Sequence, residues 1–181
     1  MTTELAVLIS GSPSPNSKSR RLLTHAGLAL ERNGFDTIQL DLHRMRAAAL
    51  LGREQDRDIA SGIAQIGTAR IVVASSPVYR ATYSGLLKVF FDLLPQAALE
   101  GKIGIPILTG GSMGHLLALD QGMRPLFASV GATVVSNGVY GCDAQFRGGI
   151  PDAELVERVE RAVDEAVRLS RAAVTSAVET D

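Results

Sequence analysis

Residues 4–20 read ELAVLISGSPSPNSKSR, a short apolar run followed by a loop that is rich in hydroxyl groups. The run Leu5–Ile9 is apolar at every position, which is typical of a central parallel strand covered on both faces. A helical pattern begins at Arg20, directly after the loop. A buried strand, a polar loop and a helix in this order predict an α/β fold with a ligand site beyond the end of the strand.

The rest of the chain continues the alternation of strand and helix. Apolar runs predict further strands over Phe35–Leu42, Arg70–Ser75, Ile103–Leu108 and Thr133–Val139. Helical spacing of apolar residues predicts helices over Arg20–Arg32, Ile59–Ile66, Ser84–Leu94, His115–Val130 and Asp152–Val174. Strands that alternate with helices imply a parallel sheet with helices on both faces.

Five strands in a chain of 181 residues fit a flavodoxin-like three-layer sandwich, whose five-stranded parallel sheet has the order 2-1-3-4-5. The competing Rossmann order usually needs a sixth strand, and the Gly-x-Gly-x-x-Gly pattern is absent after the first strand. The sequence has no internal repeat and no linker. We therefore expect one domain over residues 1–181, with fraying at 176–181.

Composition argues against several classes of protein. Apolar residues make up 46% and charged residues 20%, as in ordinary globular proteins, and a net charge of −1 disfavours a nucleic-acid binder. No apolar run reaches the length of a membrane span and no secretory signal pattern begins the chain, so we expect a cytoplasmic location. A single cysteine, Cys142, and three widely separated histidines disfavour a metal centre.

The loop after the first strand offers the groups that bind a phosphate monoester. Its hydroxyl groups come from Ser10, Ser12, Ser14, Ser17 and Ser19. It leads into a helix N-terminus, where free N–H groups and the helix dipole favour an anion, and Lys18, Arg20 and Arg21 add positive charge. An alternative stays open, in which Ser17 or Ser19 only caps the helix and the two prolines of the loop shape a turn.

Two further loops follow predicted strands at the same edge of the sheet. In a doubly wound sheet the ligand lies beyond the carboxyl ends of the strands, where the strand order reverses. The loop Pro77–Tyr83 is aromatic and turn-prone and could lie along a flat ring. The loop Thr109–Gly114 contains glycines that allow its N–H groups to approach a polar ring edge. Together the three loops predict a ligand with a phosphate at one end and a planar heterocycle at the other, which is the shape of FMN.

Two segments resemble the NADPH-dependent FMN reductase family, and more narrowly its branch linked to alkanesulfonate assimilation. They are GSPSPNSKSRRLL at residues 11–23 and SPVYRATYSGLLKVFFDLLPQAALEGKIGIPILTGGSMGHLLALD at residues 76–120, within a likeness that covers residues 5–142. The resemblance implies a flavodoxin-like enzyme that transfers hydride from NADPH, or from NADH, to FMN. It also implies that reduced flavin passes to a partner monooxygenase of a two-component, sulfonate-type system.

The resemblance further implies which residues bind the flavin. By this likeness Ser12, Ser17 and Ser19 hold the phosphate, Pro77, Val78 and Tyr79 line the isoalloxazine, and Thr109, Gly110 and Gly111 meet its polar edge. We expect no catalytic side chain and no metal, because the flavin accepts the hydride and the protein positions it.

Two positions depart from the family's pattern. Ser14 stands where many relatives have arginine, so we expect either that Lys18 or Arg20 holds the phosphate instead or that the phosphate is held less tightly. Gln121 stands where the sulfonate-linked branch often has an inserted residue, commonly an aromatic residue or histidine, that forms a π-bulge at a subunit interface. Gly122 and Pro125 also fit a simple proline kink, and both interpretations stay open.

Arg80 lies in the loop beside the predicted ring site. An arginine there could bind the 2′-phosphate of NADPH, since its guanidinium matches phosphate geometry, or it could be an ordinary exposed loop residue. The sequence does not decide between NADPH and NADH.

The predicted helix Ser84–Leu94 is apolar on nearly all sides. A helix that covers one face of a sheet normally has a polar stripe, so we expect a second subunit to cover this one in a homodimer or homotetramer. Lys88 and Asp92 are four residues apart and pair within the helix or partly across that interface. A charge introduced at Phe91 is expected to disrupt the assembly.

Three other functions use the same kind of site. The first is a reductase that retains its FMN and reduces a quinone, an azo dye or a metal oxyanion. The second is a flavodoxin-type electron carrier, which the net charge of −1, the absence of Trp and the three tyrosines disfavour. The third is a flavin-binding regulator without turnover.

Overall fold

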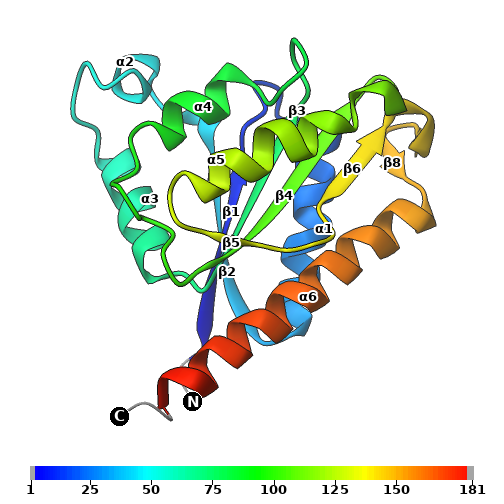
Figure 1. Ribbon diagram of the computed structural model, residues 1–181. Helices are drawn as coiled ribbons and strands as arrows, with labels where there is room; N and C mark the ends of the chain where they lie inside the picture. Colours follow the sequence, from blue (N-terminus) through cyan, green and yellow to red (C-terminus); the bar gives the residue numbers. More distant parts are fainter. Residues whose placement is uncertain (1–2, 179–181) are drawn as a thin grey trace.

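The computed structural model describes residues 3–178 (Figure 1). One sheet contains β1 (Glu4–Ser10), β2 (Phe35–Asp41), β3 (Ile71–Pro77), β4 (Ile103–Gly110), β5 (Thr133–Val134) and β6 (Val139–Cys142), and a separate hairpin contains β7 (Phe146–Arg147) and β8 (Ile150–Pro151). The α-helices are α1 (Lys18–Arg32), α2 (Ala47–Leu50), α3 (Arg57–Thr68), α4 (Gly85–Phe91), α5 (Arg124–Ala128) and α6 (Ala153–Val178). Short 3-10 turns lie at Leu42–Arg44, Met113–His115 and Asp143–Gln145, and a π-helix spans Leu119–Met123.

The strands of the main sheet are parallel and have the order β2-β1-β3-β4-β5, with β6 also paired to β4. This confirms the predicted flavodoxin-like order. The chain leaves β1 in one direction to form β2 and crosses to the other side of β1 to form β3, so the strand order reverses at β1. The carboxyl ends of the strands lie at the upper edge in Figure 1, and α6 ends at the opposite pole.

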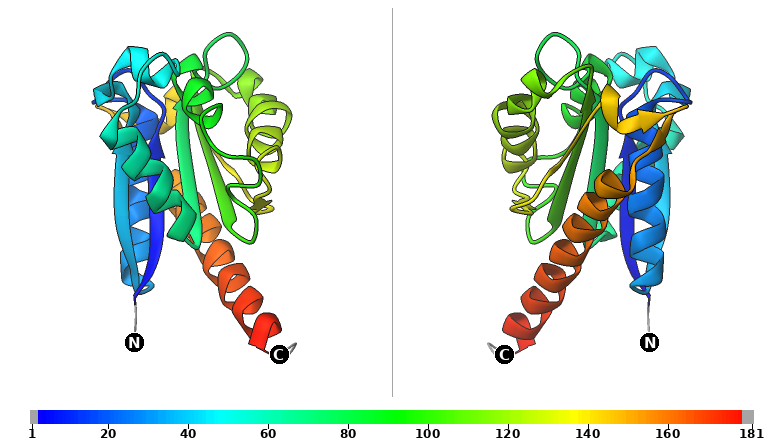
Figure 2. Two further views of the ribbon diagram at one scale, coloured as in Figure 1. Left: turned by 90° about the vertical axis from the view of Figure 1, so that its left-hand side faces the viewer. Right: turned by 90° about the vertical axis from the view of Figure 1, so that its right-hand side faces the viewer.

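Two apolar clusters cover the two faces of the sheet. Helices pack over both faces (Figure 2). Side chains alternate along β1, so Val7 and Ile9 pack under α3, α4 and α5, while Ala6 and Leu8 pack under α1 and α6. Because both faces are buried, the central strands are apolar at nearly every position. The sheet is therefore the rigid middle layer from which the connecting loops project.

Side-chain oxygens cap the N-termini of helices α1, α3 and α4. Ser17 Oγ accepts a hydrogen bond from the Arg20 N–H at the start of α1, and Asp56 accepts from Asp58 and Ile59 at the start of α3. Ser84 Oγ accepts from the Leu87 N–H at the start of α4. These caps satisfy N–H groups that have no partner within the helix, and they fix where each loop ends.

The segment after β4 differs most from the prediction. The expected strand Thr133–Val139 is divided into β5 and β6, because residues 135–138 bulge away from the ladder. Arg124 donates hydrogen bonds to the carbonyl oxygens of Val135 and Ser136. Glu165 accepts hydrogen bonds from the Ser136 and Asn137 N–H groups, so two side chains replace the missing strand partners.

The expected helix His115–Val130 is also interrupted. It begins as a 3-10 turn, continues as the π-helix Leu119–Met123 that contains Gln121, and ends as α5 with Pro125 in its first turn. Of the two interpretations of Gln121, a π-bulge and a simple proline kink, the structure shows the π-bulge. The hairpin β7–β8 was not predicted. The expected frayed end covered residues 176–181, and residues 179–181 lie outside the described residues.

Helix α4 is shorter than the predicted Ser84–Leu94; its Leu87, Phe90 and Phe91 are buried, while Leu86 and Val89 are only partly buried. Phe91 is only 3% exposed, and its ring lies 5.6 Å from the ring of Phe127 in an edge-to-face contact. Phe91 therefore belongs to the core of its own subunit, and its use as an interface probe was wrong. Lys88 and Asp92 pair within the helix.

No helix within residues 3–178 combines the length and the apolar character that crossing a bilayer requires.

Candidate functional site

Three loops converge on a pocket of about 230 Å³ at the carboxyl ends of β1, β3 and β4. The pocket is lined by Ser12, Ser14, Ser17, Lys18, Pro77, Val78, Tyr79, Thr109, Gly110, Gly111 and Asp143. The structure thus brings together all the predicted site residues except Ser19 and Arg80. Ser19 is buried beneath the loop and Arg80 is exposed beside it.

Buried hydrogen bonds connect the three loops. The Gly11 N–H donates to the Ser75 carbonyl at 2.8 Å, and the Ser84 hydroxyl donates to the Gly11 carbonyl. The Ser84 N–H donates to Ser76 Oγ at 2.8 Å. The Val78 N–H donates to the Thr109 carbonyl at 2.7 Å, which joins the second loop to the third. The pocket walls are therefore set by main-chain contacts and buried serines.

The hydroxyl loop presents several donors to the pocket. Ser12 is fully buried, and its Oγ accepts from the Ser14 N–H at 3.1 Å. Ser17 caps α1 and its Oγ lies 3.2 Å from that of Ser19, so the capping interpretation of Ser17 is confirmed. Ser17 also lines the pocket. Within residues 3–178 the N–H groups of Lys18 and Ser19 have no hydrogen-bond partner, which leaves them available to an anion.

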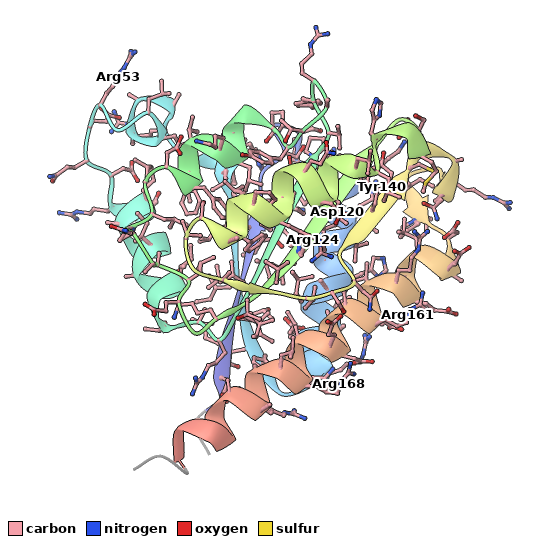
Figure 3. The ribbon with its side chains drawn as sticks, viewed as in Figure 1. Arg53, Asp120, Arg124, Tyr140, Arg161 and Arg168 are labelled. Atoms are coloured by element: carbon pink, nitrogen blue, oxygen red, sulfur yellow. The ribbon has the colours of Figure 1, made fainter. Side chains whose placement is uncertain are left out.

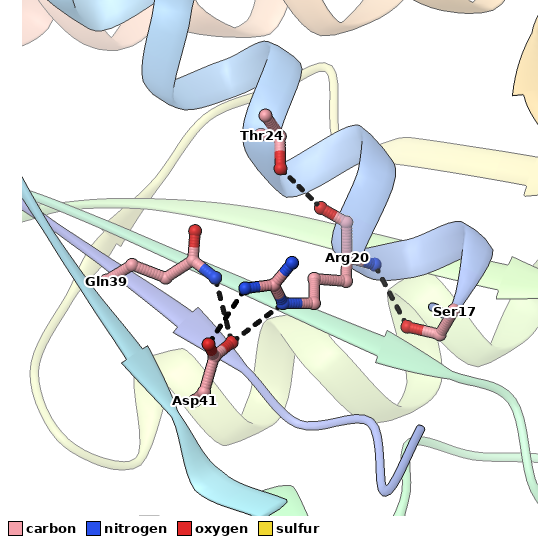
Figure 4. A network of polar contacts seen from close by, with 5 residues as sticks. All are labelled: Ser17, Arg20, Thr24, Gln39 and Asp41. Carbon is pink, nitrogen blue, oxygen red and sulfur yellow. Dashed lines mark hydrogen bonds and ion pairs between the residues drawn. The ribbon is translucent and has the colours of Figure 1, made fainter. Parts of the chain in front are cut away.

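The three cations of this segment have different surroundings. Arg20 binds Asp41 through two hydrogen bonds of 2.9 Å, and this pair joins the start of α1 to the end of β2 (Figure 4). Arg21 lines a different pocket, next to Ile150. Only Lys18 lines the pocket of the three loops, so of the two phosphate ligands suggested in place of an arginine at Ser14, Lys18 is the one in position.

The Arg20–Asp41 pair also changes the acidity of its carboxyl group. The hydrogen bonds from Arg20 lower the pKa of Asp41 below its usual range, although burial opposes the shift, and Gln39 adds a further hydrogen bond. Asp41 has a side chain that is only 12% exposed, so its negative charge is well shielded from water. The pair holds α1 at the angle that directs its N-terminus at the pocket.

The second loop forms a tight hairpin. The N–H and carbonyl groups of Tyr79 and Thr82 bond to each other, at 2.8 and 3.2 Å, and the turn between them consists of Arg80 and Ala81. Both turn residues have positive φ, at 50° and 69°, as a type I′ turn requires. Tyr79 is 49% exposed and directs an aromatic surface to the solvent side of the pocket.

The third loop is shaped by a buried tyrosine (Figure 3). The Tyr140 hydroxyl donates to the Ser112 carbonyl at 2.6 Å, and a Cβ at Gly110 would collide with that hydroxyl. Burial raises the pKa of Tyr140, with added contributions from Cys142 and Asp143, so the hydroxyl stays protonated and can donate. Gly111 has no atom near its own missing Cβ and lies open to the pocket.

The donor set fits FMN. A phosphate would meet the hydroxyls of Ser12 and Ser17, the ammonium of Lys18 and the free N–H groups at the start of α1. The pocket itself is smaller than the roughly 300–1,000 Å³ of most small-molecule sites, so a flavin ring would extend along the exposed Tyr79 hairpin. A larger cavity of about 640 Å³ is lined mainly by α3 and the segment before it, and no residue of the three loops lines it.

One lining residue was missed by sequence reasoning. Asp143 lies in the 3-10 turn after β6, and its carboxylate forms an ion pair with Lys18 at 2.8 Å. No local pattern around Cys142 and Asp143 indicates this contact, because it depends on where the edge strand ends relative to α1. Within the described residues no group of three or more His, Cys, Asp or Glu side chains could hold a metal ion.

The chain matches the model of the family described as NADPH-dependent FMN reductase over residues 5–146. It is 35% identical to a protein named FMN reductase (NADPH) from Pseudomonas putida, over 86% of this chain and 81% of the relative. It is also 35% identical to the NADH-dependent FMN reductase SfnF of Pseudomonas putida, over 87% of this chain and 88% of the relative.

A solved structure, the apo form of the NADH:FMN oxidoreductase EMOB, has a similar fold. Its TM-score to this chain is 0.83, at 33% identity, and the alignment covers 92% of this chain and 89% of the other. A flavodoxin from Streptococcus pneumoniae aligns with a TM-score of 0.61 at 18% identity, which is a similarity of fold alone.

The Arg20–Asp41 pair generates a prediction about stability. Because the pKa of Asp41 is lowered in the folded protein, the pair contributes stability above the ordinary carboxyl pKa of about 4, and this contribution disappears as the pH falls through the lowered value. We expect Asp41→Asn to reduce the free energy of unfolding by about 1–2 kcal/mol at pH 7, with a smaller difference near pH 3.

Urea unfolding at the two pH values measures this difference. Asp36→Asn, an exposed position at the other end of the same strand, is the control and should change stability by less than about 0.5 kcal/mol. A loss for Asp41→Asn that stays the same at both pH values would contradict the prediction.

Proposed function

We propose a flavin-reducing function for this chain, which belongs to the NADPH-dependent FMN reductase family. Its reaction is the transfer of a hydride from NADPH, or from NADH, to FMN. The observation that carries the proposal is the pocket between the three loops. The hydroxyl loop after β1, the second loop with its Tyr79 hairpin and the third loop with its glycines meet at the point where the strand order reverses. A phosphorylated planar heterocycle matches these three walls in that order.

Each wall has a separate task in this proposal. Ser12, Ser17 and Lys18 bind the phosphate together with the N–H groups at the start of α1, while buried Ser19 supports the position of Ser17. Pro77, Val78 and Tyr79 lie along the ring, and Thr109, Gly110 and Gly111 present main-chain groups to its polar edge. FMN supplies the hydride-accepting chemistry when bound, so the side chains bind, orient and exclude water and need not transfer a proton.

The finer proposal concerns the fate of the product. We infer that reduced FMN leaves for a partner monooxygenase of a sulfonate-type two-component system. The π-helix Leu119–Met123 supports this, because the sulfonate-linked branch that residues 76–120 resemble often carries an insertion that forms a π-bulge at this place, although Gln121 is not the aromatic residue or histidine that is common there. The π-helix lies against the second loop, since a Cβ at Gly122 would collide with Thr82 Oγ1.

The activity is tested by following nicotinamide absorbance in air with freshly purified protein. Colourless protein whose oxidation of NADPH depends on added FMN is the expected result. Yellow protein that requires a quinone or a dye, and no added flavin, would indicate a reductase that retains FMN. Yellow protein that is inert to both nucleotides would contradict the proposal and leave an electron carrier or a binding module.

Arg80 is proposed to bind the 2′-phosphate of NADPH. Its side chain is exposed at the tip of the hairpin beside the ring wall. We expect Arg80→Ala to raise the KM for NADPH about 10- to 150-fold and the KM for NADH less than 2-fold, since a hydrogen bond to a charged group is worth about 1.5–3 kcal/mol.

Steady-state kinetics with both nucleotides measures the two KM values. Arg53→Ala is the matched control, because Arg53 is exposed and points outward from the connection between α2 and α3 (Figure 3). Equal effects of Arg80→Ala on the two nucleotides would defeat the assignment.

A homo-oligomer through α4 is proposed from the outer face of that helix. Leu86 and Val89 of α4, and Leu93 just after its end, pack against the core but are only partly buried, and they recur at helical spacing beside the exposed Lys88–Asp92 pair. We expect Val89→Glu to lower the molar mass in solution to that of one chain, because a charge in an apolar interface is costly.

Light scattering after size-exclusion chromatography measures the mass. Leu28→Glu serves as the control, since Leu28 is an apolar side chain that is 48% exposed on α1, on the opposite face of the sheet. An unchanged mass for a folded Val89→Glu variant would rule out an interface through this face.

A further inference from the structure

Asp143 places a negative charge in the pocket that is proposed for a phosphate. Its carboxylate Oδ1 lies 2.8 Å from the Lys18 ammonium, and both side chains line the pocket. Lys18 is the cation and Asp143 the anion among the lining residues, so their formal charges cancel. A site that binds a phosphate dianion tightly would instead combine cations and leave them free to pair with the ligand.

The nearby arginines do not compensate for the negative charge of Asp143. Arg20 is occupied by Asp41, and Arg21 lines a separate pocket beside Ile150. Ser14 contributes a hydroxyl group and no charge. Within the described part of the chain, the positive charge of the pocket therefore depends on Lys18, and Lys18 is shared with a carboxylate.

The position of Asp143 is fixed by its surroundings. The Cys142 N–H donates to Gln145 Oε1 at 3.2 Å, which closes the 3-10 turn that begins at Asp143. The Lys18 ammonium is held from its other side by the ring of Phe146, 5.4 Å from the ring centroid. The two charged groups are thus in direct contact, because the 3-10 turn after β6 lies beside the first residue of α1.

We propose that Asp143 sets the affinity for FMN by competing with the flavin phosphate for Lys18 and by repelling that phosphate. The inference rests on the proposed function and explains how FMN could serve as an exchangeable substrate rather than a permanently bound group. The side chains of Lys18 and Asp143 are 34% and 58% exposed, so their ion pair is weak enough for a phosphate to displace the carboxylate. The remaining repulsion then favours release.

The opposite role for Asp143 is also chemically possible. A carboxylate beside Lys18 could orient the ammonium toward the phosphate, and its loss would then weaken binding. The two roles predict opposite changes in affinity when the charge is removed without a change of size, so one substitution distinguishes them.

The experiment compares Asp143→Asn with the wild-type protein in titrations of FMN and riboflavin, followed by flavin fluorescence. We expect the variant to bind FMN about 3- to 10-fold more tightly, as the removal of one nearby like charge in partly exposed surroundings predicts. Riboflavin lacks the phosphate, so its Kd should change less than 2-fold. The gain for FMN should shrink at high ionic strength.

Two further variants serve as controls. Asp36→Asn makes the same chemical change at the far end of β2 and should leave both affinities as in the wild type, which excludes an effect of net charge. Asp143→Glu keeps the charge and should bind FMN within about 2-fold of the wild type. Thermal unfolding of each variant verifies that it is folded.

The outcomes separate the inference from the proposed function. Unchanged or weaker FMN binding by folded Asp143→Asn would overturn the role of Asp143 while the flavin site itself stands. Equal tightening for FMN and riboflavin would also overturn it, because the phosphate would not be the group that Asp143 opposes. Wild-type protein that binds neither flavin would overturn the proposed function together with this inference.

Discussion

The parallel pairing of β1 with β3 is the constraint on which the site depends. These two strands lie side by side although their order in the chain is interrupted by α1, β2 and α3, and their ladder continues past the end of β1 through the bond from the Gly11 N–H to the Ser75 carbonyl. That bond holds the first and second loops at a fixed separation. A Cβ at Gly11 would collide with Leu87, so the residue that continues the ladder also lets α4 approach it.

Buried hydroxyl groups extend this constraint to the rest of the pocket. Ser76 and Ser84 are nearly inaccessible and connect the end of β3 to the start of α4 and to the Gly11 carbonyl. Each buried polar group costs free energy unless it is paired, so a set of paired serines fixes one arrangement of the loops. The walls of the pocket are therefore formed by the same contacts that stabilise the sheet edge, and a ligand does not have to order them.

The central strands and most of the pocket could be predicted because their signals are local. An apolar run such as Leu5–Ile9, or a glycine pair such as Gly110-Gly111, reveals its role within a few residues. The interrupted edge strand could not be predicted, because residues 135–137 are held by Arg124 of the preceding helix and by Glu165 of α6. The ion-pair partners of Arg20 and Lys18 could not be predicted either, because Asp41 and Asp143 are distant in the sequence and approach them only after the chain has folded.

The bulge between β5 and β6 has a consequence for the free edge of the sheet. An edge strand normally exposes unpaired main-chain groups that can recruit a strand from another molecule and begin aggregation. Here the carbonyl oxygens of Val135 and Ser136 are occupied by Arg124, and the N–H groups of Ser136 and Asn137 by Glu165. Charged side chains thus close the edge to a foreign strand at residues 135–137, so the sheet cannot grow there without first breaking these bonds.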